Sequence, residues 1–336
     1  MEETMSQAFR QTACRPGMRR IVLGALCALA LAPAAHAAEF ASQPVRLVVG
    51  TAAGGAVDTY ARVVAEALSR EIGQTVLVEN KSGANGNIAA QYVIQQPADG
   101  NTLWIGTQAM VEINPVAFKQ MPWKAEDFVP IIKGVEAPLV LATHPSVPAR
   151  SLQELIGWAR AHPGTGYASF SPGTPSQFLG YQLSESNQLD MVHVPYRGSA
   201  PQVADMVGGH ALVGFTQIQT SLPLIQDGKL NAIATTSAQR SRFLPDTPTL
   251  DELGMPELQT TVWFGVMAPA RIPADTRERL EQALVAVHRD PVVIKRLEDT
   301  GYDVSGQTGE PFAQAVADSR QRWAGLVKAT GFAPED

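Results

Sequence analysis

The stretch LVVGTAAGGAVDTYAR, residues 47–62, constrains the fold more than any other part of this 336-residue chain. Its apolar start is typical of a buried strand, the small residues 51–56 predict a loop, and a helical pattern opens at Asp58. A helix start leaves main-chain N–H groups unpaired, and the helix dipole there attracts negative charge. Gly54 and Gly55 permit a positive φ and let a ligand approach the main chain closely. The segment therefore predicts a strand, a loop and a helix start that suit a carboxylate or another small anion.

This loop lacks the residues that mark two common phosphate sites. No Gly-Lys-Ser/Thr follows it, so it is not a P-loop, and it lacks the G-x-G-x-x-G spacing of dinucleotide-binding folds. Taken alone, the loop is equally compatible with an ordinary tight turn between a strand and a helix.

Strand and helix patterns alternate along the rest of the chain. Ser151 followed by Glu154 has the spacing of a capping box and predicts a helix start. The alternation predicts an α/β fold of parallel sheets flanked by helices, in which ligands bind beyond the carboxyl ends of the strands. We expect strands at residues 45–50, 75–79, 102–107, 139–143, 167–171, 191–194, 211–216, 230–236 and 262–268, helices at 57–72, 87–95, 273–289 and 311–330, further helices from about 151, 176 and 199, and irregular structure at 243–256.

The first 37 residues have the pattern of a secretory signal peptide. Two arginines precede an apolar stretch at 21–31, and the sequence AHA at 35–37 is a small-x-small cleavage site. The apolar stretch is too short to span a bilayer comfortably as a permanent anchor. We therefore expect a mature protein that starts at Ala38, resides in a bacterial periplasm and does not insert into the membrane.

Composition narrows the classes of partner. The chain carries 32 Asp and Glu against 26 Lys and Arg and has no basic run, which argues against nucleic acid or an anionic membrane as partner. Its two cysteines, Cys14 and Cys27, both fall in the expected leader. The mature chain is therefore expected to contain no disulfide, no thiol nucleophile and no thiolate metal site.

Signals for catalysis are weak. The sequence contains no G-x-S-x-G, H-E-x-x-H or D-x-D pattern, and its six histidines are scattered. Ser171 or Ser176 with His193 would provide a nucleophile and a base, but nothing in the sequence orients such a pair. We expect no catalytic residue, no metal and no cofactor, and a serine-type hydrolase is the weakest alternative.

Five segments in sequence order, the first of them residues 47–62, point to a known family. The segments are LVVGTAAGGAVDTYAR (47–62), VENKSGANGNIAA (78–90), YASFSPGTPSQFLGYQL (167–183), MVHVPYRGSAPQVADMVGG (191–209) and VWFGVMAPARIP (262–273). Together they resemble the periplasmic solute receptors of tripartite tricarboxylate transporters, the Bug or TctC-like family, from about residue 44 to the C-terminus. The chain departs from the family at Gly50-Thr51, where Pro-Phe is common, and at Thr216-Gln217, where Asp-Asn is common.

The resemblance implies a two-lobed type II periplasmic binding protein, a Venus flytrap in which each lobe is a largely parallel sheet flanked by helices. Lobe 1 would hold residues 38–142 and 261–336, and lobe 2 would hold 143–260. A small organic acid would bind in the cleft through main-chain and hydroxyl donors, and a monomeric receptor would deliver it to the membrane subunits of a tripartite transporter. A sensing protein that feeds a signalling partner is the alternative, because the capture chemistry would be the same.

The resemblance also implies which residues contact the ligand. Asp58 either bonds the ligand or caps the helix and braces the loop. Arg197 either pairs with a second carboxylate or faces solvent at the rim, and His193 is expected in the core. We expect the ligand-binding residues to be Thr51, Ala52, Ala53, Gly54, Gly55, Ala56, Asp58 and Thr107 from the first lobe, and Ser171, Gly173, Thr174, Ser176, Gln177, Tyr196 and Gln217 from the second.

Overall fold

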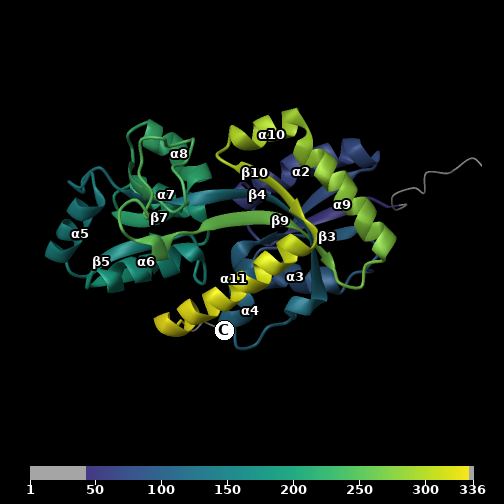
Figure 1. Cartoon of the computed structure of the whole chain (residues 1–336), viewed down its shortest axis with the longest axis horizontal. Helices are drawn as coiled ribbons and strands as arrows, with labels where there is room; N and C mark the ends of the chain where they lie inside the picture. Colours follow the sequence, from purple (N-terminus) through teal and green to yellow (C-terminus); the bar gives the residue numbers. More distant parts are fainter. Residues whose placement is uncertain (1–42, 333–336) are drawn as a thin grey trace, which may run out of the picture. The chain divides into compact units, whose positions relative to one another are not determined.

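Two β-sheets that share one long strand organise residues 43–332, the part of the chain that this computed structural model describes (Figure 1). The expected leader and its cleavage site lie outside the described residues. The first sheet has the order β2 (Val76–Asn80), β1 (Val45–Val49), β3 (Thr102–Thr107), β9 (Thr261–Pro269) and β4 (Phe128–Thr143), and β10 (Asp303–Thr308) also pairs with β4. The second sheet contains β6 (Met191–Pro195), β5 (Thr165–Ser169), β7 (Val213–Gln217), β4 and β8 (Asn231–Thr235).

Each sheet combines parallel strands with antiparallel ones. β1 is parallel to β2 and β3, and β5 is parallel to β6 and β7, whereas β9 runs antiparallel to both β3 and β4. Four of the five residues of β1 are buried, as expected for a strand covered on both faces by helices. The long strand β4 changes partners along its length: it pairs with β9 as far as Pro138 and with β7 from Leu139 onward.

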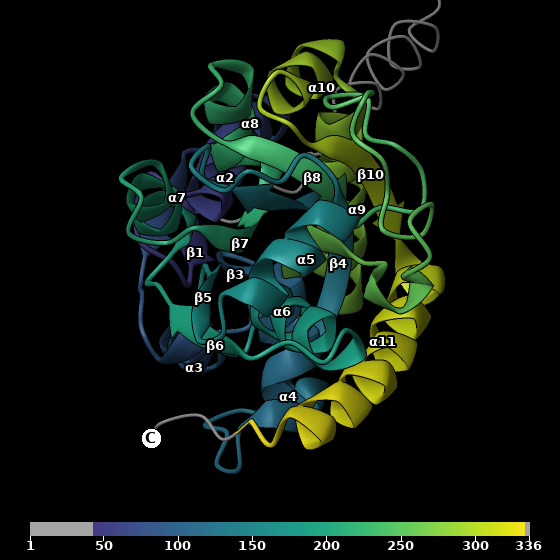
Figure 2. The ribbon, with the colours of Figure 1, turned by 90° about the vertical axis from the view of Figure 1, so that its left-hand side faces the viewer.

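Helices follow the strands and cover both faces of each sheet (Figures 1 and 2). Short turns of 3-10 helix and the π-helical turn η3 (Ala109–Ile113) link some of them. The α-helices are α2 (Ala56–Ile72), α3 (Asn87–Ile94), α4 (Asn114–Ala117), α5 (Leu152–Ala161), α6 (Pro175–Ser186), α7 (Ser199–Val207), α8 (Ile218–Gln226), α9 (Ala274–Arg289), α10 (Pro291–Glu298) and α11 (Gly309–Thr330). No helix within residues 43–332 is long and apolar enough to cross a membrane.

Aromatic residues form the core of the first sheet. On one face, Trp104 packs against Trp123 and Phe128, with ring centroids 5.4 and 4.7 Å away. On the other face, Tyr60 of α2 lies 6.2 Å from Phe264 of β9. Burying rings of this size is the largest apolar contribution that single side chains make to folding, so β1 and β3 are held rigidly where they end at the candidate site.

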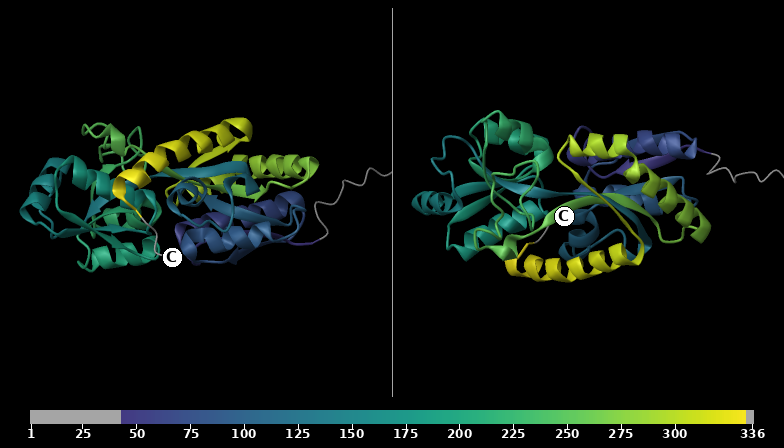
Figure 3. Two further views of the ribbon diagram at one scale, coloured as in Figure 1. Left: turned by 90° about the horizontal axis from the view of Figure 1, so that it is seen from below. Right: turned by 45° about the horizontal axis from the view of Figure 1, so that its top comes forward.

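The last helix, α11, contacts elements of both sheets (Figures 1 and 3). Ser319 on α11 donates a hydrogen bond to Glu112, which follows β3. Further along the helix, Trp323 lies 5.8 Å from Phe178 of α6, and the carbonyl of Ala329 accepts a hydrogen bond of 3.1 Å from the Tyr181 hydroxyl. α11 therefore ties the end of β3 to a helix of the second sheet.

Most expected elements are present within a few residues. The segment 243–256 contains turns, one isolated bridge and, at Pro256, the first residue of the 3-10 helix η5 (Pro256–Leu258). The elements that the sequence did not indicate include the first eleven residues of β4, the helix α10, the strand β10 and the short helices η3 and α4. Internal contacts group all described residues into one unit, so the lobe boundaries near residues 142 and 260 stay predictions.

Candidate functional site

The loop between β1 and α2 has the predicted strand–loop–helix geometry. Gly54 has a φ of 81°, in the left-handed region that disfavours side chains. Gly55 does not: its φ is −83°, and it is the N-cap residue of α2. The expectation of a glycine-dependent backbone is therefore confirmed at Gly54 and wrong at Gly55. Ala52, Ala53 and Gly54 are exposed.

The start of α2 keeps main-chain donors free. Its N-cap, Gly55, makes no side-chain cap, and the Gly54 N–H donates to Asp58. The N–H groups of Ala53 and Ala56 donate to no other described residue, whereas residues 52–55 form a turn. The Thr51 hydroxyl oxygen is buried and also lacks a partner among the described residues. The loop thus offers unpaired N–H and O–H groups at the positive end of a 17-residue helix.

Asp58 holds this loop in place. It is 2% exposed, and its carboxylate accepts hydrogen bonds from the Gly54 N–H (2.9 Å), from Arg62 (2.8 and 3.1 Å) and from Asn80 (2.9 Å). Burial by itself raises the pKa of Asp58, but these hydrogen bonds and the Arg62 charge outweigh it, so the pKa lies below its usual value. Its acceptor sites are filled by the protein, so Asp58 braces the loop. It is not the helix cap, which is Gly55.

Three loops meet at this place. Gly50 approaches Gly86 so closely that a Cβ on Gly50 would lie 2.8 Å from the Gly86 Cα. Asn85, next in the chain, receives a hydrogen bond of 3.3 Å from the Ser171 hydroxyl and donates one of 2.8 Å to Asn114. Residues 51–56, 84–86 and 171–177 therefore form one neighbourhood, which we call the candidate cleft.

Asn85 was not among the expected site residues. It has a φ of 50°, and Asn114 anchors it from the far side by donating to the Asn85 carbonyl at 2.9 Å. A non-glycine residue in this conformation is costly, so the surrounding contacts must hold it there. The string SGANGN, with small residues and two asparagines before a helix, is the sequence signal that could have indicated it.

The hydroxyls of the 171–177 loop bond within the loop. The Thr174 hydroxyl donates to the Ser171 carbonyl at 2.6 Å and lies 2.9 Å from the Ser176 hydroxyl. Ser176 is fully buried and accepts from the N–H of Phe170. Gln177 accepts from the N–H of Gly173 at 2.7 Å. These side chains shape the loop, and the picture of Thr174 and Ser176 as outward-facing hydroxyl donors is not supported by these contacts.

The remaining expected residues lie at or just beyond strand ends, and two of them, Thr107 and Tyr196, have internal side-chain partners. Thr107 is buried and its hydroxyl accepts from the N–H of Met110 at 3.3 Å. The Tyr196 hydroxyl donates to Asp205 at 2.9 Å, and burial raises the pKa of Tyr196 to about 12. Gln217 is the N-cap residue of α8, with no side-chain cap. Arg197 is exposed and forms no ion pair with another residue of the described chain.

His193 pairs with a different serine from those considered for catalysis. Its Nε2 lies 2.6 Å from the hydroxyl of Ser169, which is fully buried. Burial lowers the pKa of His193 to about 4, and its ring packs against Tyr167 at a centroid distance of 5.3 Å. A nucleophile must reach its substrate, so a serine without exposed surface does not fit that role.

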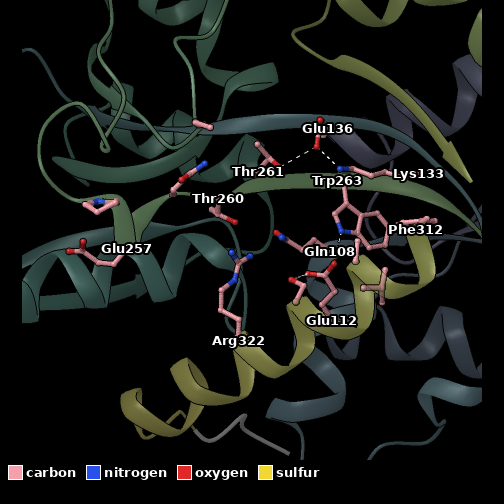
Figure 4. Close-up of a pocket in the computed structure, with 16 residues that line it drawn as sticks. Gln108, Glu112, Lys133, Glu136, Glu257, Thr260, Thr261, Trp263, Phe312 and Arg322 are labelled. Carbon is pink, nitrogen blue, oxygen red and sulfur yellow. Dashed lines mark hydrogen bonds and ion pairs between the residues drawn. The ribbon is translucent and has the colours of Figure 1, made fainter. Parts of the chain in front are cut away.

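A separate cavity of about 550 Å³ lies between α11 and the strands β4 and β9 (Figure 4). None of the expected ligand-binding residues lines it among the described part of the chain. Glu112 in its wall is 2% exposed and accepts from the indole N–H of Trp263 at 2.8 Å. Burial raises the pKa of Glu112. Within residues 43–332, no group of three His, Cys, Asp or Glu side chains is arranged to hold a metal ion.

A sequence profile of the tripartite tricarboxylate transporter family receptors, TctC, matches residues 60–332. Among curated proteins, BugT of Bordetella pertussis is 32% identical over 316 residues, which cover 92% of this chain and 96% of BugT.

Solved structures show the same fold. A Rhodopseudomonas palustris protein with adipate superposes with a TM-score of 0.82 at 31% identity, covering 88% of this chain and 99% of that one. MatC from the same organism, with bound malate, has a TM-score of 0.78 at 27% identity, covering 85% and 100%. Both cover almost their full length, so the two-lobed architecture expected from the sequence is confirmed for this chain.

Proposed function

The chain belongs to the tripartite tricarboxylate transporter receptor family, and on that basis we propose that it captures a small organic acid in the candidate cleft and delivers it to the membrane subunits of such a transporter. The observation that carries this proposal is the start of α2, where the exposed Ala53 and the buried Ala56 have N–H groups without a partner among the described residues. The adipate and malate that two structural relatives hold are carboxylates, the class of ligand that such donors suit.

The groups of the protein that bind the acid carry no charge. The acid binds through main-chain N–H groups of the loop, and the Thr51 hydroxyl beside them, which is buried, lacks a partner among the described residues. Neutral donors satisfy a carboxylate without the desolvation cost of burying a counter-charge. Asp58 lies behind the loop with its acceptors filled, so its negative charge is neutralised by Arg62 and does not face the ligand. Such a site binds and releases its ligand unchanged.

The protein acts in the periplasm as a non-catalytic receptor. Family membership supports this role, and the buried Ser169–His193 pair has no exposed nucleophile to offer. Genes for one large and one small membrane subunit beside the gene for this protein would support transport, whereas a neighbouring sensor kinase would support the signalling alternative.

Mass spectrometry of the ligand released from freshly purified, denatured protein tests the proposal. We expect one small carboxylic acid, which calorimetry then shows to rebind stoichiometrically to the emptied protein and to leave it unchanged. Recovery of a chemically altered product after incubation, or failure of every mono-, di- and tricarboxylate to bind, would contradict it.

A further inference from the structure

The cavity beside α11 contains polar groups that no described residue satisfies. Gln108 is 4% exposed and its side-chain oxygen is buried without a hydrogen-bond partner, and Thr260 is 7% exposed with its hydroxyl oxygen in the same state. Both line the cavity. A buried polar group left unpaired costs about 1–3 kcal/mol, so two of them in residues that line one space indicate a polar occupant beside them.

A cationic side chain points at the same place. Arg322 on α11 also lines the cavity, and Figure 4 shows its guanidinium directed toward Gln108 and Thr260. Arg322 forms no ion pair with any other residue in the described range, although it lies 5.7 Å from the ring of Trp323. A guanidinium offers several N–H donors in a plane that matches a carboxylate.

The other charges of the wall limit how much negative charge the cavity accepts. Lys133 is paired with Glu136, which leaves the cation Arg322 beside the exposed carboxylate of Glu257 and the carboxyl group of Glu112, which is buried and already accepts from Trp263 and Ser319. A second or third carboxylate on the ligand would face these acidic groups. A protonated amine would instead be attracted to them and would donate to the unpaired oxygen of Gln108.

From these groups we infer that the cavity is a second ligand site, separate from the candidate cleft, for a small zwitterion with one carboxylate and one protonated amine. Arg322 binds the carboxylate, Gln108 accepts from the amine, and the Thr260 hydroxyl bonds either group. The volume of about 550 Å³ is in the range of small-molecule sites, and the inference does not depend on the function of the cleft.

Fluorine NMR of protein labelled with 5-fluorotryptophan tests this site directly. Trp263 lies in the cavity wall, while Trp158 on α5 is outside the cavity and serves as the internal reference. L-Alanine is the zwitterionic probe, propionate lacks its amine, and succinate carries a second carboxylate. We expect alanine to move the Trp263 signal at millimolar concentration, and propionate and succinate to require at least about tenfold more.

Variants separate the cavity from the cleft. Arg322→Gln changes an exposed side chain and should weaken alanine binding at least about tenfold, and Gln108→Leu should do the same if it folds normally. Arg277→Gln, an exposed arginine on α9 outside the cavity, is the matched control and should leave binding unchanged. Gly54→Val, which alters only the cleft loop, should also leave it unchanged.

Three outcomes would overturn the inference. They are a Trp263 signal that does not respond to about 10 mM alanine, a response that survives Arg322→Gln at full strength, and a response that Gly54→Val abolishes. The last result would place alanine in the candidate cleft and leave the proposed receptor function intact. Equal responses to alanine and propionate would refute the requirement for an amine.

Discussion

The helices α2 and α5 both have an acidic side chain that accepts from a backbone N–H just before the helix, but they differ in whether the other N–H groups at the helix start have partners. At α5, the Ser151 hydroxyl accepts from the Glu154 N–H at 3.3 Å, and the Glu154 carboxylate accepts from the N–H groups of Arg150 and Ser151 at 2.7 and 3.2 Å. At α2, Asp58 likewise accepts from the N–H four residues back, that of Gly54. Its N-cap is glycine, however, so no hydroxyl fills the remaining donors.

The difference shows what the N-cap side chain decides. A serine N-cap satisfies the N–H groups of its own helix, whereas a glycine N-cap leaves them free to bind a ligand. The capping box of α5 stabilises its own helix. The start of α2 lacks that stabilisation, and its N–H donors remain available to a ligand. Asp58 supplies the rigidity that a cap would otherwise add. Substitutions on the two helices should therefore have separable effects on binding and on stability.

The largest effect is expected from Gly54→Val. Valine is strongly disfavoured at a φ of 81°, so the loop must change shape and its N–H groups turn away from the ligand. We expect affinity for the natural ligand, measured by calorimetry, to fall by about hundredfold or more, which corresponds to about 3 kcal/mol.

A matched glycine controls for backbone strain. Gly228 has a φ of 69°, and a Cβ there would meet open space, as at Gly54. Gly228→Val should lower stability to a similar extent and leave affinity unchanged. If both variants bind as tightly as the wild type, or if both lose binding equally, the α2 loop has no special role.

Asp58→Asn should have the next largest effect. The amide that replaces one carboxylate oxygen cannot accept from the donors around it, and a lost charged hydrogen bond of this kind costs about 1–3 kcal/mol. We expect urea unfolding at pH 7 to show that loss, and affinity to fall about tenfold as the loop loosens. Unchanged stability and affinity would remove Asp58 from the bracing role.

The pH dependence of the same pair gives a second measurement. The folded-state pKa of Asp58 lies below its ordinary value of 3.8, so the ionised carboxylate contributes stability that is fully present above pH 3.8. That contribution is lost as the pH falls further, through the lowered pKa. The stability difference between wild type and Asp58→Asn should accordingly shrink below pH 3.8, and a difference that stays constant would show that charge is not its source.

Ser151→Ala should lower stability and spare binding. Removing an N-cap hydroxyl typically costs about 1 kcal/mol, and α5 begins away from the loops of the candidate cleft. Thermal or urea unfolding measures the loss, and calorimetry should find wild-type affinity. A parallel loss of affinity would mean that the starts of α2 and α5 are not independent.

Arg197→Gln should have the smallest effect. Exposed side chains without partners usually contribute less than about 0.5 kcal/mol, and Arg197 is exposed. We expect a change in affinity below about twofold. A tenfold loss would show that the receptor uses a salt bridge after all, and would favour a ligand with a second carboxylate.

The elements with strong periodicity could be predicted from the sequence, and the exceptions have physical reasons. Residues 128–138 of β4 contain Pro130, Lys133, Glu136 and Pro138, which break an apolar strand pattern, yet pairing with β9 and β10 supplies the backbone partners. The helix α10 was missed because only Asp290 separates it from α9. β10, with the sequence DVSGQT, has almost no apolar residue to reveal it.

The candidate site also has parts that could be predicted from the sequence and parts that could not. The α2 loop was predictable because small residues at the end of a buried strand indicate a loop with an accessible backbone, whatever the rest of the chain does. The roles of Thr174 and Ser176 were not predictable, because the sequence does not tell whether a serine or threonine hydroxyl faces outward or forms hydrogen bonds within its own loop. Both of these hydroxyls form hydrogen bonds within their loop. Asn85 was hidden for a related reason, since its importance depends on Ser171 and Asn114, which are distant in the chain.

Because the ligand-binding donors at the start of α2 are main-chain N–H groups, side-chain substitutions cannot remove them. Every residue except proline carries the same main-chain donor. Residues 52–56 are already alanine and glycine, so an alanine scan would leave three of the five positions unchanged and would remove no N–H group from the other two. Such a scan would not test these donors. Deleting the donors themselves requires backbone chemistry, such as replacing single amides with esters by semisynthesis, which removes one N–H at a time and keeps the side chains.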